Sequence, residues 1–131
     1  KTLDSPTVFV GNWNWGFADG VGTTAEVNTP YQGVFVKNEK YIAEGKEDIY
    51  DFYLADAGNH CIRIISPEGK VTTFAGRGSK GLDENTWGFV DGEIREEARF
   101  NQPWGIEYDE HRNTFYIADK NNHRIRMITL D

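Results

Sequence analysis

The chain lacks several features that would assign it to a functional class at once. Only one of its 131 residues is a cysteine, Cys61, so no disulfide can form within the chain. No apolar run approaches the roughly 18 residues of a membrane-spanning helix. Basic residues are outnumbered, with 14 Lys and Arg against 21 Asp and Glu and a formal net charge of −7. This balance argues against nucleic acid as a partner, because phosphate-binding proteins present clustered basic surfaces.

Catalytic motifs are also missing from the sequence. It contains no G-x-S-x-G, H-E-x-x-H, phosphate-binding loop or calcium-binding loop. Cys61 falls within a strand-like segment rather than at a helix start, which predicts an inert thiol. Zinc needs three or four converging ligands, and the chain has three histidines, His60, His111 and His123. We therefore predict no metal, no cofactor and no catalytic residue, and a non-enzymatic function is favoured.

Short segments rich in β-branched and aromatic residues, separated by Gly, Asn, Asp and Pro, predict an all-β fold. The only helix-like stretch, 93–99, is too short for more than a turn or two. The expected strands fall in two series. The first series is Gly33–Val36, Phe52–Asp56, Cys61–Ser66 and Val71–Gly76, and the second is Gly105–Tyr108, Thr114–Asp119 and Arg124–Leu130.

A tandem duplication relates these two series. Residues 52–64 match residues 115–127 at 8 of 13 positions. The sequence WGFADG recurs as WGFVDG, AEVNTPYQG recurs as ARFNQPWG, and TVFVG recurs as TTFAG, in the same order along the chain. Unequal spacing between the copies predicts insertions in loops. The first repeat covers about 30–76 and the second about 103–131 of a single unit, 1–131.

Each copy is expected to form a four-stranded blade of a β-propeller. The second copy ends before its fourth strand, whereas Thr7–Gly11 carries the sequence of a fourth strand at the other end of the chain. This order is typical of propellers in which a strand from one terminus completes a blade at the other. Two blades cannot close a ring, since propellers have 4–8 blades. The partners expected are therefore missing blades of a longer chain or copies of this one.

The repeated motifs resemble those of NHL-repeat β-propellers. These motifs are a Pro and Gly before the first strand, an aromatic-x-Ala-Asp at the end of the second, and Asn-His-x-Ile-Arg at the third. They stand here as Pro30, Gly33, 53–56, Asn59, His60, Ile62 and Arg63, and as Pro103, Gly105, 116–119, Asn122, His123, Ile125 and Arg126. The resemblance implies six blades, completed by the rest of a longer chain or by a trimer. The long connection 76–105 resembles bacterial cell-surface NHL proteins, often with an IPT/TIG domain, which implies an extracytoplasmic location.

The recurring polar residues of the turns are interpreted as structural. Antiparallel order places these turns on the same face of the blades as the WGF-x-DG loops, opposite the charged connection 37–51. Carboxylates readily accept hydrogen bonds from turn amides, and an arginine between packed sheets must be paired. The residues assigned this role are Asp56, Asn59, His60, Arg63, Asp119, Asn122, His123 and Arg126. The alternative, in which the two histidines bind metal, is less favoured.

Aromatic and acidic residues on the same face are the candidate ligand-binding residues. Exposed rings stack on apolar faces of a ligand, and carboxylates accept hydroxyl or amide protons. The candidates are Trp15, Asp19, Tyr31, Trp87, Asp91 and Trp104. Tyr31 and Trp104 precede the strand nearest the propeller axis, so they are the best candidates to line a central pocket. The alternative is that these side chains pack the loops over the blade.

Two functions remain open at this point. The first is a non-catalytic module that binds a protein or glycan at the cell surface. The second is a metal-dependent propeller enzyme of the lyase or lactonase type, which would hold an ion at the ring centre.

Overall fold

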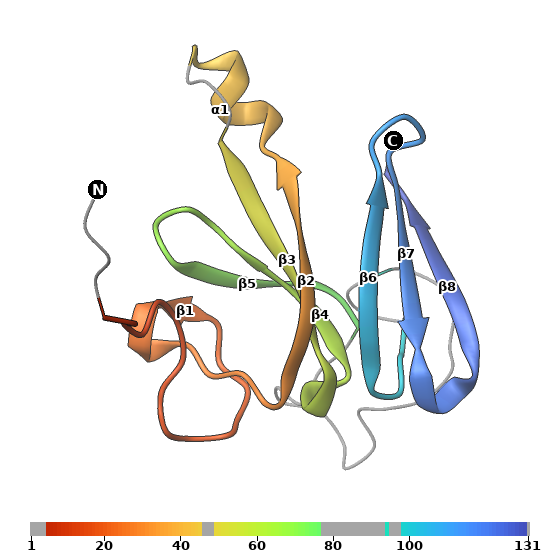
Figure 1. Ribbon diagram of the computed structural model, residues 1–131, viewed down its shortest axis with the longest axis horizontal. Helices are drawn as coiled ribbons and strands as arrows, with labels where there is room; N and C mark the ends of the chain where they lie inside the picture. Colours follow the sequence, from red (N-terminus) through yellow and green to blue (C-terminus); the bar gives the residue numbers. More distant parts are fainter. Residues whose placement is uncertain (1–4, 46–48, 77–93, 95–97, 131) are drawn as a thin grey trace.

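The computed structural model describes residues 5–45, 49–76, 94 and 98–130, and these form two antiparallel sheets (Figure 1). The first sheet has the strand order β1-β5-β4-β3-β2 and the second the order β6-β7-β8. The strands are β1 Gly20–Val21, β2 Pro30–Lys37, β3 Tyr50–Asp56, β4 Cys61–Ile65, β5 Lys70–Ala75, β6 Pro103–Asp109, β7 Thr114–Asp119 and β8 Arg124–Thr129. The predicted all-β class is confirmed, and each of the seven strands expected in the two copies is present.

The sheets contain five and three strands rather than four each. Strands β2 to β5 form the expected blade, and the short β1 is added at its outer edge, where Gly20 pairs with Val71. The segment 7–11, expected to be a strand, is not one. A strand needs a neighbour to satisfy its backbone groups, and in the described part of the chain this segment pairs with the edge of neither sheet. Strand β8 accordingly has one sheet neighbour, β7.

Within the described residues, four short helical segments connect the strands. They are η1 Gly22–Thr24, α1 Glu39–Ala43, η2 Ala57–Asn59 and η3 Lys120–Asn122. Helix α1 lies in the charged connection at one end of the first sheet (Figure 1). It begins where the side chain of Asn38 accepts hydrogen bonds from the backbone of Lys40 and Tyr41, at 3.0 and 3.4 Å. The helix-like stretch 93–99 lies largely outside the described residues. Among those described, no helix is long and apolar enough to cross a membrane.

The apolar core lies between the two sheets. Phe115 of β7 is at its centre, with ring centroids 4.7 Å from Tyr53, 5.2 Å from Phe74 and 4.7 Å from Tyr108. Burial raises the pKa of Tyr53 to about 12. Because side chains alternate along a strand, β3 directs Tyr53 and Ala55 into this core and Phe52 and Leu54 to the opposite face.

The two sheets meet through non-equivalent faces, as consecutive blades do. Sheet two contributes Phe115 and Ile117 to the shared core; their counterparts in the first copy, Phe52 and Leu54, lie on the far face of sheet one. Each sheet consequently has an apolar side that the other does not cover. Phe35 is 66% exposed on the first sheet, and Ile125 and Met127 are 69% and 64% exposed on the second.

Candidate functional site

A buried carboxylate organises the turn between β3 and β4. Asp56 is completely buried, and its Oδ1 accepts a hydrogen bond from the backbone N–H of Asn28 at 2.8 Å. Its Oδ2 accepts bonds from the side chains of Asn59, at 2.7 Å, and Arg63, at 2.8 Å. Burial raises the pKa of Asp56, and these three donors together with the Arg63 charge oppose that rise.

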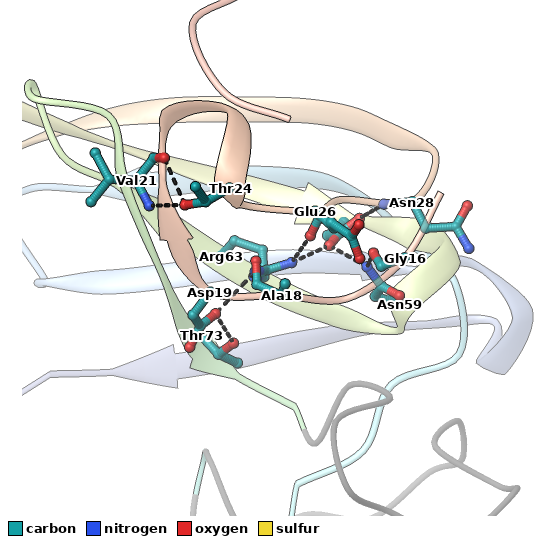
Figure 2. A network of polar contacts seen from close by, with 11 residues as sticks. Gly16, Ala18, Asp19, Val21, Thr24, Glu26, Asn28, Asn59, Arg63 and Thr73 are labelled. Atoms are coloured by element: carbon teal, nitrogen blue, oxygen red, sulfur yellow. Dashed lines mark hydrogen bonds and ion pairs between the residues drawn. The ribbon is translucent and has the colours of Figure 1, made fainter. Parts of the chain in front are cut away.

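Arg63 connects this carboxylate to the loop that precedes β2. Its guanidinium also donates to the backbone oxygens of Ala18 and Glu26 and to the carboxylate of Asp19, each at 2.9 Å (Figure 2). The Phe17 ring covers the guanidinium, with its centroid 4.4 Å from Cζ. The side chain is fully buried, so these protein acceptors replace the water that a buried arginine has lost.

The second copy repeats this arrangement. Oδ1 of Asp119 accepts from the backbone of Asn101 at 2.7 Å, and its Oδ2 accepts from Asn122 at 2.7 Å and from Arg126 at 2.8 Å. Arg126 also donates to the backbone oxygen of Arg99 at 2.9 Å. In both copies the same atoms thus join the turn after the second strand to the segment that precedes the first strand.

The two recurring histidines end their turns with the same backbone geometry. His60 and His123 have φ values of 56° and 55°, the left-handed region that reverses the chain tightly. His60 has a further contact, because its Nδ1 accepts a hydrogen bond from the backbone N–H of Gln102 at 3.0 Å. Burial lowers the pKa of His60, and the charge of Asp119 acts in the opposite direction. This imidazole therefore connects the first sheet to the segment that enters the second.

Tyr31 and Trp104 form a stacked pair across the two sheets. Their ring centroids are 4.3 Å apart and the ring planes differ by 22°. Nζ of Lys120 lies 3.9 Å from the centroid of the Trp104 ring, within cation–π distance. Tyr31 remains 52% exposed and Trp104 36%. The structure thus brings together two of the six candidate ligand-binding residues.

A β-bulge positions each ring of the pair. In the first sheet Pro30 pairs with Asp56 and Gly33 with Leu54, so two residues of β2 oppose one of β3. In the second sheet Pro103 pairs with Asp119 and Gly105 with Ala118, leaving Trp104 without an opposing residue. Bulges bend a strand and redirect its side chains. Both bulges begin beside a buried aspartate, which ties the pair to the blade network.

The other candidate residues have different surroundings. Trp15 is 81% exposed and has no ring contact with the pair. Asp19 accepts hydrogen bonds from Arg63 and from Thr73 at 2.9 and 3.1 Å, so its carboxylate belongs to the blade network. Trp87 and Asp91 lie outside the described residues.

Sequence reasoning missed two polar residues beside the pair. Lys120 occupies the position of Ala57 in the first copy, and Gln32 is the additional residue of the β2 bulge. The signal that could have revealed them is the difference between the copies, since a residue required by the blade recurs in both. Within the described part of the chain, no group of three or more His, Cys, Asp and Glu residues converges.

The comparisons with known proteins agree with this geometry. Residues 100–127 match the family model described as NHL repeat. The chain contains an NHL repeat. Human NHL repeat-containing protein 2 is 32% identical over 118 residues, a match that includes 89% of this chain and 14% of that protein. The resemblance to NHL-repeat propellers is confirmed, whereas the six-blade count stays a prediction.

Two bacterial crystal structures resemble the NHL-repeat chain throughout its length. An auxiliary nutrient binding protein from Bacteroides ovatus is 49% identical, with a TM-score of 0.83, over 92% of this chain and 28% of that one. A protein from Bacteroides thetaiotaomicron, named as a candidate phosphatase, is 44% identical, with a TM-score of 0.84, over 95% of this chain and 26% of that one. The chain thus spans little more than a quarter of either structure.

Proposed function

We propose that this NHL-repeat chain is part of a non-catalytic propeller that binds a protein or glycan ligand outside the cytoplasm, at the cell surface. The Tyr31–Trp104 pair carries the proposal. It is the one place among the described residues where two aromatic side chains from different sheets stack on each other and remain solvent-accessible. Exposed stacked aromatics supply large contact area with few rotatable bonds, which suits recognition.

The similar proteins support a binding role. The related Bacteroides ovatus structure is called an auxiliary nutrient binding protein. It is 49% identical to this chain over 92% of its length. Nutrient capture takes place outside the cytoplasm, which agrees with the location implied by the NHL resemblance. On this proposal the uncovered sheet faces pack against further blades, and the ligand contacts the end of the sheets that carries η2 and η3.

The alternative is a metal-dependent propeller enzyme of the lyase or lactonase type. The enzyme name of the Bacteroides thetaiotaomicron relative is the observation that favours catalysis. Metal content and turnover of the purified protein separate the two functions. A stoichiometric ion together with hydrolysis or elimination of a substrate would establish the enzyme, and ligand binding without turnover would establish the module.

Binding is tested by presenting the protein separately to surface glycans and surface proteins of the cell that produces it, on a biosensor. The wild-type protein is expected to bind one of the two fractions. The double substitution Tyr31→Ala with Trp104→Phe is expected to weaken that binding at least tenfold, because both rings of the pair change. Tyr50→Ala, which removes a partly exposed ring at the opposite end of the first sheet, is the matched control. Equal binding by the double variant and the control would disprove the assigned site.

A further inference from the structure

We infer that the Tyr31–Trp104 pair is a stacking platform for one pyranose ring of an oligosaccharide, with Gln32 and Lys120 as its polar neighbours. The inference rests on the proposed binding function and names the ligand class of that site.

The open surface of the platform is the outer face of Tyr31. Trp104 has Tyr31 stacked on its ring at 4.3 Å and Lys120 over the same ring at 3.9 Å. Both side chains therefore contact the indole ring, and the three form one cluster. With 52% of its surface exposed, Tyr31 offers a flat apolar face to solvent.

The platform is held rigid from both sheets before any ligand arrives. Tyr31 is set by the β2 bulge and Trp104 by the β6 bulge, and each bulge adjoins a proline paired with a buried aspartate. Those aspartates are fixed by their arginine partners at 2.8 Å. A side chain that is already ordered loses little conformational entropy on binding. The platform is therefore preorganised for a flat ligand whose individual contacts are weak.

Gln32 supplies hydrogen-bonding groups beside the rings. A Cβ atom added at Gly105 would lie 2.9 Å from Oε1 of Gln32, so the absence of a side chain at Gly105 leaves room for this amide to extend from the first sheet to the second. Within the described part of the chain, the Gln32 amide makes no side-chain hydrogen bond, and the residue is exposed. An amide offers two donors and an acceptor, which match the hydroxyl groups along the rim of a sugar.

A pyranose fits these groups better than the other ligand classes. One face of the sugar ring presents C–H groups that stack on an aromatic face, and its rim carries the hydroxyls that an amide and an ammonium group bind. A polyanion is disfavoured by the net charge of −7. Tyr31 presents an open flat ring, which matches the C–H face of a sugar ring.

The experiment titrates the purified protein with soluble hexasaccharides of glucose, xylose and mannose, with calorimetry and tryptophan fluorescence as readouts. At least one sugar is expected to bind. Tyr31→Ala is expected to lower its affinity about tenfold or more, since the whole stacking face is lost. Gln32→Ala and Lys120→Ala are expected to lower it severalfold. Trp104→Phe is expected to keep the packing on Tyr31 and to remove the tryptophan fluorescence change that accompanies binding. Tyr50→Ala is expected to bind the sugar like the wild type.

The remaining outcomes would overturn the inference. Sugar binding that survives both Tyr31→Ala and Gln32→Ala would place the sugar elsewhere. Binding of a surface protein through Tyr31, with no sugar bound, would leave the proposed function standing and assign the platform to a peptide ligand. Substrate turnover with unchanged activity in Tyr31→Ala would refute both the inference and the binding module.

Discussion

The backbone N–H of Gln102 donates a 3.0 Å hydrogen bond to Nδ1 of His60. Both residues have left-handed backbone geometry, with φ values of 52° and 56°. Gln102 lies just before β6, and His60 just before β4. Only a neutral imidazole nitrogen can accept this bond, because both nitrogens of the protonated ring are donors. This hydrogen bond between the two halves therefore forms only when the His60 ring is neutral.

Stability is expected to fall on acidification through His60. Its pKa is lowered by burial from the ordinary value of 6.5, so the unfolded chain binds this proton more readily than the folded one. The stabilisation is complete above about pH 6.5 and is lost as the pH falls from there through the folded pKa. Thermal unfolding of the wild type and of His60→Asn, measured between pH 8 and pH 5, checks this. The variant is expected to be less stable at pH 8 and to depend less on pH.

His123→Asn is the matched control, since His123 has the same turn geometry, with a φ of 55°. Asparagine tolerates this backbone region, so the strain of the turn changes equally in both variants. If His123→Asn flattens the pH dependence as strongly as His60→Asn, the bond to Gln102 is not its source.

Removing the Arg63 guanidinium is expected to destabilise the first blade strongly. Arg63→Met leaves the fully buried Asp56 without its ion pair and is expected to cost about 3–5 kcal/mol in the free energy of unfolding. Arg112→Met removes a 75% exposed side chain that pairs with Asp109 at 3.5 Å and is expected to cost at most about 1 kcal/mol. Urea unfolding of both variants measures the difference. Similar losses in the two variants would contradict the assigned role of the buried network.

The uncovered sheet faces are expected to drive association of the 131-residue chain when it is produced alone. Exposed apolar patches are rare on soluble monomers, and Phe35, Ile125 and Met127 are all more than half exposed. Light scattering should therefore give a mass above the 14.9 kDa of one chain. Ile125→Lys with Met127→Lys is expected to reduce that mass, whereas Arg112→Met should leave it unchanged. A monodisperse 14.9 kDa species for the wild type would contradict the prediction.

The thiol of Cys61 is expected to be inert in the folded protein. The residue is completely buried, and burial raises its pKa well above the ordinary value, so little reactive thiolate forms at pH 8. A thiol reagent at pH 8 should label the native protein slowly, at a rate set by unfolding. The denatured chain should react at once with one equivalent of the reagent, since it has one cysteine. Rapid labelling of the native protein would show that the site opens.

The longer strands could be predicted from the sequence, and the shortest elements could not. The β-branched and aromatic patterns of β3 and β7 are strong and recur in both copies. Strand β1 has two residues and exists because the edge of β5 accepts it. Segment 7–11 has a strand-like sequence, but its pairing depends on a neighbour that the sequence of the segment does not specify. Helix α1 spans five residues, too few to show a helical periodicity of apolar residues in the sequence.

The candidate site was predictable only in part for a related reason. Repetition identified Asp56 and Arg63, because a residue needed by every blade appears in each copy. Asp19 was predicted as a ligand contact because its carboxylate lies near exposed aromatic residues, and in the structure that carboxylate pairs with Arg63. Lys120 and Gln32 have no equivalent side chain in the other copy. Lys120 contacts Trp104 within the second copy, whereas Gln32 lies beside Gly105 because the two sheets pack together. Contacts between copies follow from three-dimensional arrangement, which a linear pattern does not encode.

The unequal bulges have a consequence for valency. Strand β2 carries two residues between Pro30 and Gly33, while β6 carries one between Pro103 and Gly105. The duplicated halves therefore do not provide two interchangeable docking points. On the proposed function they jointly form one, with Tyr31 from the first sheet and Trp104 and Lys120 from the second half of the chain, so a bound chain would have a defined polarity. Avidity would then have to come from several molecules displayed together rather than from the internal repetition of one.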